Sequence, residues 1–312
     1  MEQLAILMAT YNGEKYIAEQ LDSLLNQTVS DFTVYIHDDG STDNTVEIIK
    51  QYQKKYPDRF QCLEYPPSGG AKNNFLSLLR MVEAQYYMFC DQDDVWFPEK
   101  VKISYSEMKK CESGNWDMPC VVFGDMQVTD RERRVISTSY LKYVKKDPQK
   151  ISLKELLVQN VAAGCTMMIN RKLALLSLHY QNQDSIFMHD WWIMLIAACV
   201  GKIAYMNKPL LMYRQHGDNS VGIGKDRYKW LKEKVRNVIG GKQLDVSKQG
   251  IIYQRKIARE LLKLEVLTEA DQKLLNRLAT IEKENKYIRM QFYIRNRMIC
   301  LDWKNFWKIF LV

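Results

Sequence analysis

The feature that most constrains the fold of this chain is an alternation, over residues 4–125, of short apolar runs with longer segments of helical periodicity. The first run, LAILMA at residues 4–9, is followed by apolar residues at the helical spacing of Ile17, Leu21 and Leu24. Such an alternation predicts an α/β protein whose strands are mostly parallel and are covered by helices. On the same grounds we expect strands at residues 32–37, 61–65, 86–90 and 120–128, and helices at residues 45–55, at 74–83 and after Pro98.

The rest of the chain is less regular and ends in a basic segment. We expect helices at residues 152–159 and 190–200, and strands at residues 165–169 and 210–213. Residues 225–312 are predicted to be mostly helical. They hold 21 Lys and Arg against 10 Asp and Glu, a net charge of +11. Because the whole chain has a net charge of +8, residues 1–224 carry −3. A near-neutral body, residues 1–224, is therefore predicted to carry a basic helical extension, residues 225–312.

The overall composition excludes several classes of protein. The longest apolar run, Trp191–Val200, has ten residues, well short of the roughly 20 that span a bilayer. The first residues, MEQLAILMATYNG, contain neither a basic leader nor a small-residue cleavage site. The seven cysteines are odd in number and lack C-x-x-C spacing, which favours reduced thiols in a cytoplasmic protein over a disulfide or zinc framework.

Three polar clusters follow predicted strands: TYNG at residues 10–13, DDGSTD at residues 38–43 and DQDD at residues 91–94. Ligands of open α/β sheets bind beyond the carboxyl ends of the strands, so we expect these clusters to share one edge. Each also has a purely structural interpretation. The first two suit tight turns, with Thr42 or Asp43 as a helix cap, and DQDD suits a solvated loop in which Asp94 caps a helix.

The DQDD cluster makes the most specific prediction. Its three carboxylates lie within four positions, directly after the apolar run YYMFC. Packed like charges repel and are costly to bury, so something should compensate them. Carboxylate oxygens suit a hard cation, and Mg²⁺ or Mn²⁺ needs only one or two of them when it also bridges phosphates. The cluster therefore indicates a divalent-cation site.

Taken together, ATYNGEKYI, DDGSTD, DQDDVW and the later HDWW resemble the inverting family-2 glycosyltransferases over residues 3–222. The resemblance implies a GT-A fold, a Rossmann-like and mostly parallel central sheet flanked by helices, here with a helical C-terminal extension. It divides the body into a nucleotide-sugar-binding half, about residues 1–125, and an acceptor half, residues 126–224. YRQHGDNSVG further resembles bacterial rhamnosyltransferases that use a deoxythymidine-diphosphate sugar.

The family's motifs also imply roles for individual residues. Asp91 and Asp93 match the D-x-D motif, with His216 as a further ligand of Mg²⁺ or Mn²⁺. Lys72 replaces an arginine of the family, which removes a bidentate contact. The residues implied in donor binding are Thr10, Tyr11, Asn12, Asp38, Asp39, Lys72, Asn73 and Asp91.

The segment HDWW is expected to carry the chemistry on the acceptor side. The resemblance makes Asp190 the general base, and the same residue is suited to cap the helix that follows. His189 replaces a glutamate of the family. Together with His189, the residues expected near the acceptor are Trp191, Trp192 and Gly164, with core packing as the alternative for the tryptophans.

The predicted reaction moves a sugar from a nucleotide diphosphate, with dTDP-L-rhamnose as the candidate donor, to a hydroxyl of a cell-surface glycan or undecaprenyl-linked acceptor. The alternatives are a UDP-hexose transferase of the same fold and a non-catalytic nucleotide-sugar-binding protein. The stretch YIRNRMICLDWKNFWKIFLV mixes basic and aromatic residues, which suits the inner face of an anionic plasma membrane. Packing on the body or on a second subunit is its alternative, and nucleic acid is not an expected partner.

Overall fold

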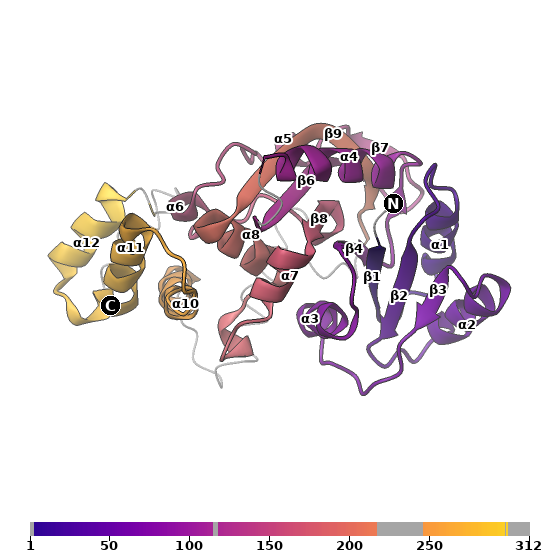
Figure 1. The fold of residues 1–312 in the computed structure, drawn as a ribbon, viewed down its shortest axis with the longest axis horizontal. Helices are drawn as coiled ribbons and strands as arrows, with labels where there is room; N and C mark the ends of the chain where they lie inside the picture. Colours follow the sequence, from indigo (N-terminus) through magenta and orange to yellow (C-terminus); the bar gives the residue numbers. More distant parts are fainter. Residues whose placement is uncertain (1–2, 115–117, 217–245, 297, 299–312) are drawn as a thin grey trace.

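The computed structural model describes residues 3–114, 118–216, 246–296 and 298. Within these ranges one sheet has the strand order β3-β2-β1-β4-β8-β6-β9-β5, with β7 paired to β6 (Figure 1). The first strands and helices lie at one end of the molecule in this view, and the C-terminal helices lie at the other. The α/β architecture predicted from the sequence is confirmed.

The first half of the sheet follows the predicted alternation. Its four strands are parallel: β1 (Leu4–Thr10), β2 (Thr33–Asp38), β3 (Phe60–Cys62) and β4 (Tyr86–Asp91). Three helices connect them: α1 (Ile17–Leu25), α2 (Thr45–Lys55) and α3 (Ala71–Met81). The register places Thr10 opposite Asp38 and Ala9 opposite Asp91. The three polar clusters therefore meet at one edge of the sheet, as the sequence predicted.

The second half contains antiparallel neighbours that the sequence pattern did not predict. Strand β8 (Met167–Asn170) lies between β4 and β6 (Cys120–Thr129) and is antiparallel to both. Strand β9 (Lys202–Arg214) is parallel to β6. Two short strands, β5 (Val95–Trp96) and β7 (Val135–Ser137), pair antiparallel with β9 and β6. An apolar run reports that a strand is buried but not which way it runs.

The connections in this half are mostly short. The helices are α4 (Lys100–Glu112), α5 (Tyr140–Tyr143), α6 (Leu153–Leu156), α7 (Arg171–Ser177) and α8 (His189–Val200), with 3₁₀ turns η1 (Gly164–Thr166) and η2 (Gln183–Ser185). The helix expected at residues 152–159 is reduced to α6. Neither α5 nor α7 was predicted, because each is too short to establish an apolar period.

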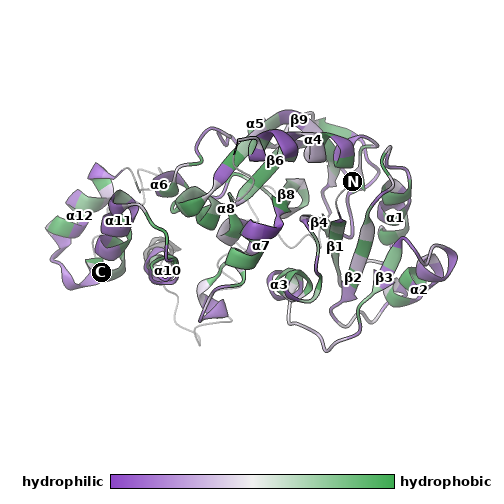
Figure 2. Ribbon diagram, in the orientation of Figure 1, coloured by the Kyte–Doolittle hydropathy of each residue, from purple (hydrophilic) through white to green (hydrophobic). Residues whose placement is uncertain are grey.

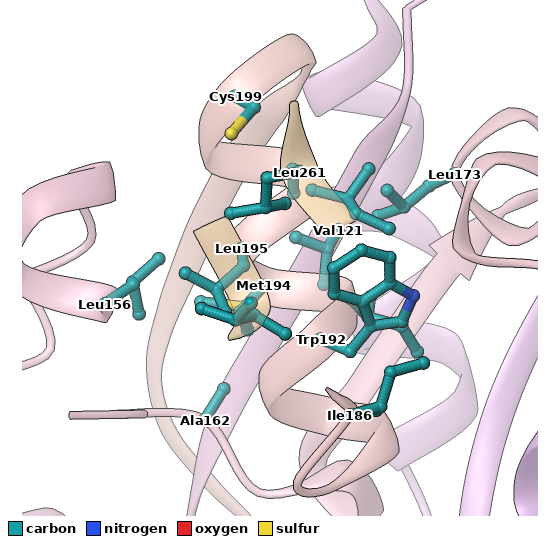
Figure 3. Close-up of a cluster of buried hydrophobic side chains, with 14 of the residues drawn as sticks. Val121, Leu156, Ala162, Leu173, Ile186, Trp192, Met194, Leu195, Cys199 and Leu261 are labelled. Atoms are coloured by element: carbon teal, nitrogen blue, oxygen red, sulfur yellow. The ribbon is translucent and has the colours of Figure 1, made fainter. Parts of the chain in front are cut away.

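Helix α8 lies at the centre of the main hydrophobic core. Its residues Trp192–Ala197 are all fully buried, and its ribbon is mostly hydrophobic in Figure 2. A helix that is apolar on every side must be surrounded by protein. Figure 3 shows Trp192 and Leu195 close to Val121 of β6 and to Leu261 of the C-terminal region. The sheet and the C-terminal helices therefore share one core.

The C-terminal region is helical, as predicted, with α10 (Val246–Leu261), α11 (Glu269–Thr280), the 3₁₀ turn η3 (Ile281–Lys283) and α12 (Lys286–Arg295). Ile257, Leu261, Leu275 and Leu278 are fully buried in the same core as α8. The predicted boundary at residues 224/225 and most of the aromatic, basic stretch lie outside the described residues. Of the helices in the described ranges, none combines the length and apolar character needed to cross a membrane.

Candidate active site

The loops after β1 and β2 are joined by side-chain hydrogen bonds. The Thr10 hydroxyl donates to Asp38 Oδ1 at 2.8 Å. Asn12 has a left-handed backbone, φ 49°, and its side-chain oxygen accepts from Thr42 N at 2.8 Å. Asp38 Oδ2 also accepts from Ser41 N at 2.7 Å. These contacts make Thr10, Asn12 and Asp38 the framework of a rigid loop pair, a role that the turn chemistry of both motifs predicts.

Asp39 points to a different loop. One oxygen of its carboxylate accepts from the backbone N–H groups of Ser68 and Gly69, and the other accepts from Gly70 N. Gly69 and Gly70 have positive φ angles of 82° and 111°, which turn successive N–H groups toward one carboxylate. Three backbone N–H donors therefore fix the Asp39 carboxylate at the start of α3.

Gln92 is a residue whose role the sequence did not indicate. Its side-chain amide accepts from Tyr11 N and donates to Tyr11 O, each at 2.8 Å. This pairing joins the loop after β4 to the loop after β1. A Cβ at Gly13 would overlap the Gln92 amide, so glycine is needed there for close approach. Tyr11 itself is exposed.

The acidic cluster is partly desolvated. Burial raises the pKa of Asp91 to about 7, and the charges of Asp93 and Asp190 add to the rise. Burial also raises the pKa of Asp94 well above its usual range, with Asp93 and Asp91 contributing. Asp94 Oδ2 is buried and has no hydrogen-bond partner within the described residues. Burial and the neighbouring carboxylates therefore disfavour the charged forms of Asp91 and Asp94.

Lys100 is a buried cation whose charge lowers the pKa values of Asp91 and Asp94, against the effect of burial. It is fully buried, its Nζ donates to the carbonyl of Cys165, and it lies 4.1 Å from the centre of the Trp96 ring. Burial lowers the pKa of Lys100 to about 8, while Asp94 and Asp91 favour its charged form. The Lys100 hydrogen bond goes to a carbonyl and not to a carboxylate, and a group of carboxylate oxygens fits a divalent cation.

The possible ligands of that cation are grouped in two ways. Oxygens of Asp91 and Asp94 and the sulfur of Cys165 lie within 4.8 Å of one another. The predicted set, Asp91 with Asp93 and His216, is linked by a contact between Asp93 Oδ2 and His216 Nε2 at 2.7 Å. Oxygen and imidazole ligands suit Mg²⁺ or Mn²⁺ better than a set that includes sulfur. Asp94 does not cap α4, since the residue before that helix is Glu99.

His216 and Arg214 bring the end of β9 to the acidic cluster. The His216 ring lies 4.7 Å from the Tyr16 ring, and the Arg214 guanidinium lies 4.7 Å above the same ring. Arg214 is buried and donates from Nε to the carbonyl of Asp93 at 3.1 Å. Arg214 was not selected from the sequence, although YRQH placed it two residues before His216.

Asp190 lies in the first turn of α8, whose N-cap is Met188 rather than Asp190. Its Oδ1 accepts from Trp191 N at 2.6 Å. Burial raises the pKa of Asp190 to about 6, against the lowering effects of the Trp191 and Gly164 N–H groups and of Lys146. The helix terminus alone would favour the charged form, so desolvation outweighs it. The Asp190 carboxylate is close enough to Asp91 to raise the pKa of Asp91.

His189 packs in the core, where the sequence predicted an acceptor contact. Its ring lies 4.3 Å from the ring of Phe75 and 5.0 Å from that of Phe89. Both ring nitrogens are buried without a partner among the described residues. Burial lowers the pKa of His189 to about 3, so the ring is neutral. A Cβ at Gly164 would overlap His189 Nε2, which explains the need for glycine in this loop.

The two tryptophans differ in their surroundings. Trp192 is fully buried, and its Nε1 donates to the carbonyl of Ser177 at 2.8 Å. It belongs to the core, so the predicted acceptor contact is wrong for Trp192 and the packing alternative holds. Trp191 is only partly buried, and its Nε1 donates to the carbonyl of Leu156 at 2.6 Å. Trp191 remains next to Asp190 at the edge of the core.

Lys72 and Asn73 contact the segment that leads into α8. Lys72 Nζ donates to the carbonyls of Gln183 and Ile186, each at 3.0 Å. Asn73 Oδ1 accepts from the side chain of Gln183 at 2.9 Å. Both residues were predicted at the donor, and both connect α3 to the chain just before Asp190.

Comparison with known proteins defines the class of this chain. The profile described as Glycosyl transferase family 2 matches residues 5–175. The dTDP-rhamnosyl transferase RfbG of Shigella flexneri is 30% identical over 256 residues, which cover 74% of this chain and 83% of that protein. Chondroitin synthase of Escherichia coli is 33% identical over 138 residues, covering 44% and 19%. The chain belongs to glycosyl transferase family 2.

Solved structures agree on the fold. Residues 1–349 of S. aureus TarS in complex with UDP-GlcNAc align with a TM-score of 0.57 at 18% identity, covering 94% of this chain and 79% of that one. The mannosyltransferase PcManGT from Pyrobaculum calidifontis, in complex with GDP-Man and Mn²⁺, aligns with a TM-score of 0.50 at 14% identity, covering 98% and 87%. The protein is thus a glycosyltransferase with the predicted GT-A fold.

Proposed function

We propose that this glycosyltransferase moves a sugar from a nucleotide diphosphate to an acceptor hydroxyl with inversion at the anomeric carbon. The first donor to consider is dTDP-L-rhamnose, because the relative from S. flexneri is named a dTDP-rhamnosyl transferase and matches most of both chains. A UDP-hexose is the alternative donor.

The observation that carries the proposal is the proximity of Asp190 to the DQDD cluster. These residues are about a hundred positions apart in the sequence, yet the Gly164 N–H donates to Asp190 and the sulfur of the next residue, Cys165, lies within 4.8 Å of oxygens of Asp91 and Asp94. The charge of Asp190 also contributes to the raised pKa of Asp91. A base must reach the acceptor hydroxyl while the leaving group is held beside it. With a pKa of about 6, Asp190 is mostly ionised at neutral pH and is basic enough to accept the hydroxyl proton.

Asp91, Asp93 and His216 would hold a divalent cation, Mg²⁺ or Mn²⁺, at this edge. The unpartnered oxygen of Asp94 and the raised pKa of Asp91 support the fit. The cation would supply Lewis-acid stabilisation of charge on the leaving diphosphate. His216 Nε2 lies 2.7 Å from Asp93 Oδ2, so the two proposed ligand groups lie side by side.

For the donor we propose a surface formed by Thr10, Tyr11, Asn12, Asp38 and Asp39, with Lys72 and Asn73 at its border. The fixed carboxylate of Asp39 can accept from a base imide or a ribose hydroxyl. Residues 1–125 would thus form the donor half and residues 126–224 the acceptor half. Gly164 would act by leaving room for the chain that carries Asp190.

The acceptor we propose is a glycan, including one linked to undecaprenyl at the cytoplasmic face of the plasma membrane. Support comes from the basic and aromatic composition of residues 293–312, which suits peripheral contact with anionic lipid. Flotation with anionic liposomes, with and without residues 297–312, tests this part. Equal recovery of both forms would remove it.

A panel of nucleotide sugars with Mn²⁺ tests the donor. Purified protein is incubated with dTDP-rhamnose, UDP-glucose, UDP-galactose and GDP-mannose, and release of the nucleotide diphosphate is followed with and without chelator. We expect chelator-sensitive release from dTDP-rhamnose. Release from a UDP-hexose alone would replace the donor assignment, and no response to any donor would contradict the proposed reaction.

A further inference from the structure

Residues 181–190, which lead into Asp190, are held between two helices that are far apart in the sequence. On one side, Lys72 and Asn73 of α3 bind Gln183 and the carbonyl of Ile186. On the other side, α10 supplies Glu260, whose Oε2 accepts from Gln181 N at 3.1 Å. Before α8 begins at His189, this stretch contains only the short turn η2 as regular structure, so its course depends on such contacts.

Tyr253 of α10 contacts the residues on both sides of Asp190 in the sequence. Its hydroxyl accepts from Phe187 N at 3.2 Å. Its ring centre lies 5.5 Å from that of Phe187 and 5.3 Å from that of Trp191. Phe187 and Trp191 also contact each other at 5.7 Å. The three rings form one cluster that brackets Asp190 in the sequence, with one member before it, one after it and one from α10.

Hydrogen bonds connect this ring cluster to the Asp190 carboxylate. Trp191 N donates to Asp190 Oδ1, and the Trp191 side chain is fixed at its other end by the Leu156 carbonyl. The phenol of Tyr253 is near enough to Asp190 that, after burial, the Asp190 charge adds to the rise in the Tyr253 pKa. Fixing a catalytic group within a fraction of an ångström is what such packed, hydrogen-bonded neighbours achieve.

We propose that Tyr253 is a positioning residue for the general base, so that α10 completes the acceptor side of the active site rather than serving as an appendage. The proposal rests on the assignment of Asp190 as base. It predicts that the hydroxyl of Tyr253 acts on turnover and not on nucleotide binding, because its hydrogen bond goes to Phe187, just before Asp190, and its ring packs on Phe187 and Trp191.

The test compares Tyr253→Phe with Tyr293→Phe. Tyr293 of α12 is also buried, and its hydroxyl has no hydrogen-bond partner among the described residues, so its removal should be neutral. Amide hydrogen exchange of the peptide containing Phe187 is measured in the full chain, together with kcat, KM for the donor and affinity for the free nucleotide with Mn²⁺.

In Tyr253→Phe we expect exchange in this peptide to rise by roughly two- to tenfold, the worth of one hydrogen bond. We expect kcat to fall by about tenfold to a hundredfold, as for small displacements of a reacting group. Nucleotide affinity and melting temperature should match those of Tyr293→Phe. A general loss of stability would instead raise exchange throughout the C-terminal helices.

Unchanged exchange at Phe187 would overturn the proposal, and so would raised exchange with wild-type kcat. The exchange measurement needs no substrate, so it decides the structural part even if the wild-type protein shows no transfer to any acceptor. In that case the proposed function fails on the donor panel and the positioning of residues 181–190 is judged separately.

Discussion

The donor edge and the segment that carries Asp190 are stabilised in different ways. At the donor edge, the loops after β1, β2 and β4 bind one another through side chains that belong to the motifs themselves, such as Thr10 with Asp38. The segment at residues 181–190 is instead fixed by α3 and α10, through residues such as Lys72 and Tyr253. The two regions are thus held by largely different contacts, with Lys72 and Asn73 of α3 between them, so most contacts of each region can be perturbed separately.

The largest expected effect is that of Asp190→Asn. Removing a general base typically costs about 10²–10⁴ in rate, and asparagine keeps the size of the side chain. We expect kcat to fall by this amount while calorimetric affinity for the nucleotide and Mn²⁺ stays near wild type. Near wild-type turnover in this variant would show that another group takes the proton.

Asp93→Ala should weaken nucleotide binding, in contrast to Asp190→Asn, which should lower kcat and leave nucleotide binding unchanged. Loss of a proposed cation ligand should weaken Mn²⁺-dependent nucleotide binding by at least the roughly 10–100-fold typical of outer-shell partners. Calorimetry with and without Mn²⁺ measures the metal-dependent part. Asp130→Ala is a control outside the acidic cluster. If nucleotide binding depended equally on Mn²⁺ in the two variants, Asp93 would not be a ligand of the cation.

A pair of glycine substitutions sharpens the comparison. In Gly13→Ala the new Cβ displaces Gln92 and breaks its two hydrogen bonds to Tyr11, so nucleotide affinity should fall. In Gly164→Ala the Cβ meets His189 beside Asp190, so kcat should fall instead. Each should cost about 1–3 kcal/mol of stability, the usual effect of overpacking, measured by denaturant unfolding. Identical kinetic defects in the two variants would contradict the separation of the two regions.

The smallest expected effect concerns pH. As the proposed base, Asp190 would act only when ionised, so kcat/KM should decline as the pH falls through about 6, the raised pKa of Asp190. Lys146 favours the ionised form. In Lys146→Met the acidic limb should therefore move to higher pH, by less than about one unit for a charge near the protein surface. Lys150→Met is the matched control, and its profile should overlay that of the wild-type protein.

The sequence predicted well that the three polar clusters meet at one edge of the sheet, for a physical reason. Strand ends in a parallel sheet meet at one edge, so TYNG, DDGSTD and DQDD could be placed together from the order of the elements alone. Turn residues such as Asn12 indicate the local backbone geometry, since asparagine tolerates a positive φ. Gln92 was missed because a glutamine side chain that imitates a backbone partner has no distinctive spacing.

The surroundings of Asp190 were predicted less completely, because the contacts there are long-range. Tyr253 lies 63 positions after Asp190, and nothing in the periodicity of α10 distinguishes its hydroxyl from that of any other tyrosine. Trp192 and His189 were expected near an acceptor because of their place in HDWW, yet a helix that is buried on all sides turns both toward the core. The direction of β8 was likewise settled by tertiary packing.

The most direct test of the account is the location of the cation and of the diphosphate. Crystals grown with Mn²⁺ and dTDP, with diffraction collected at the manganese absorption edge, would show both. We expect one anomalous peak beside Asp91, Asp93, His216 and the diphosphate, on the side of the cluster that faces Asp190. A manganese ion bound elsewhere, or a nucleotide bound away from Asp39 and Asp93, would contradict it.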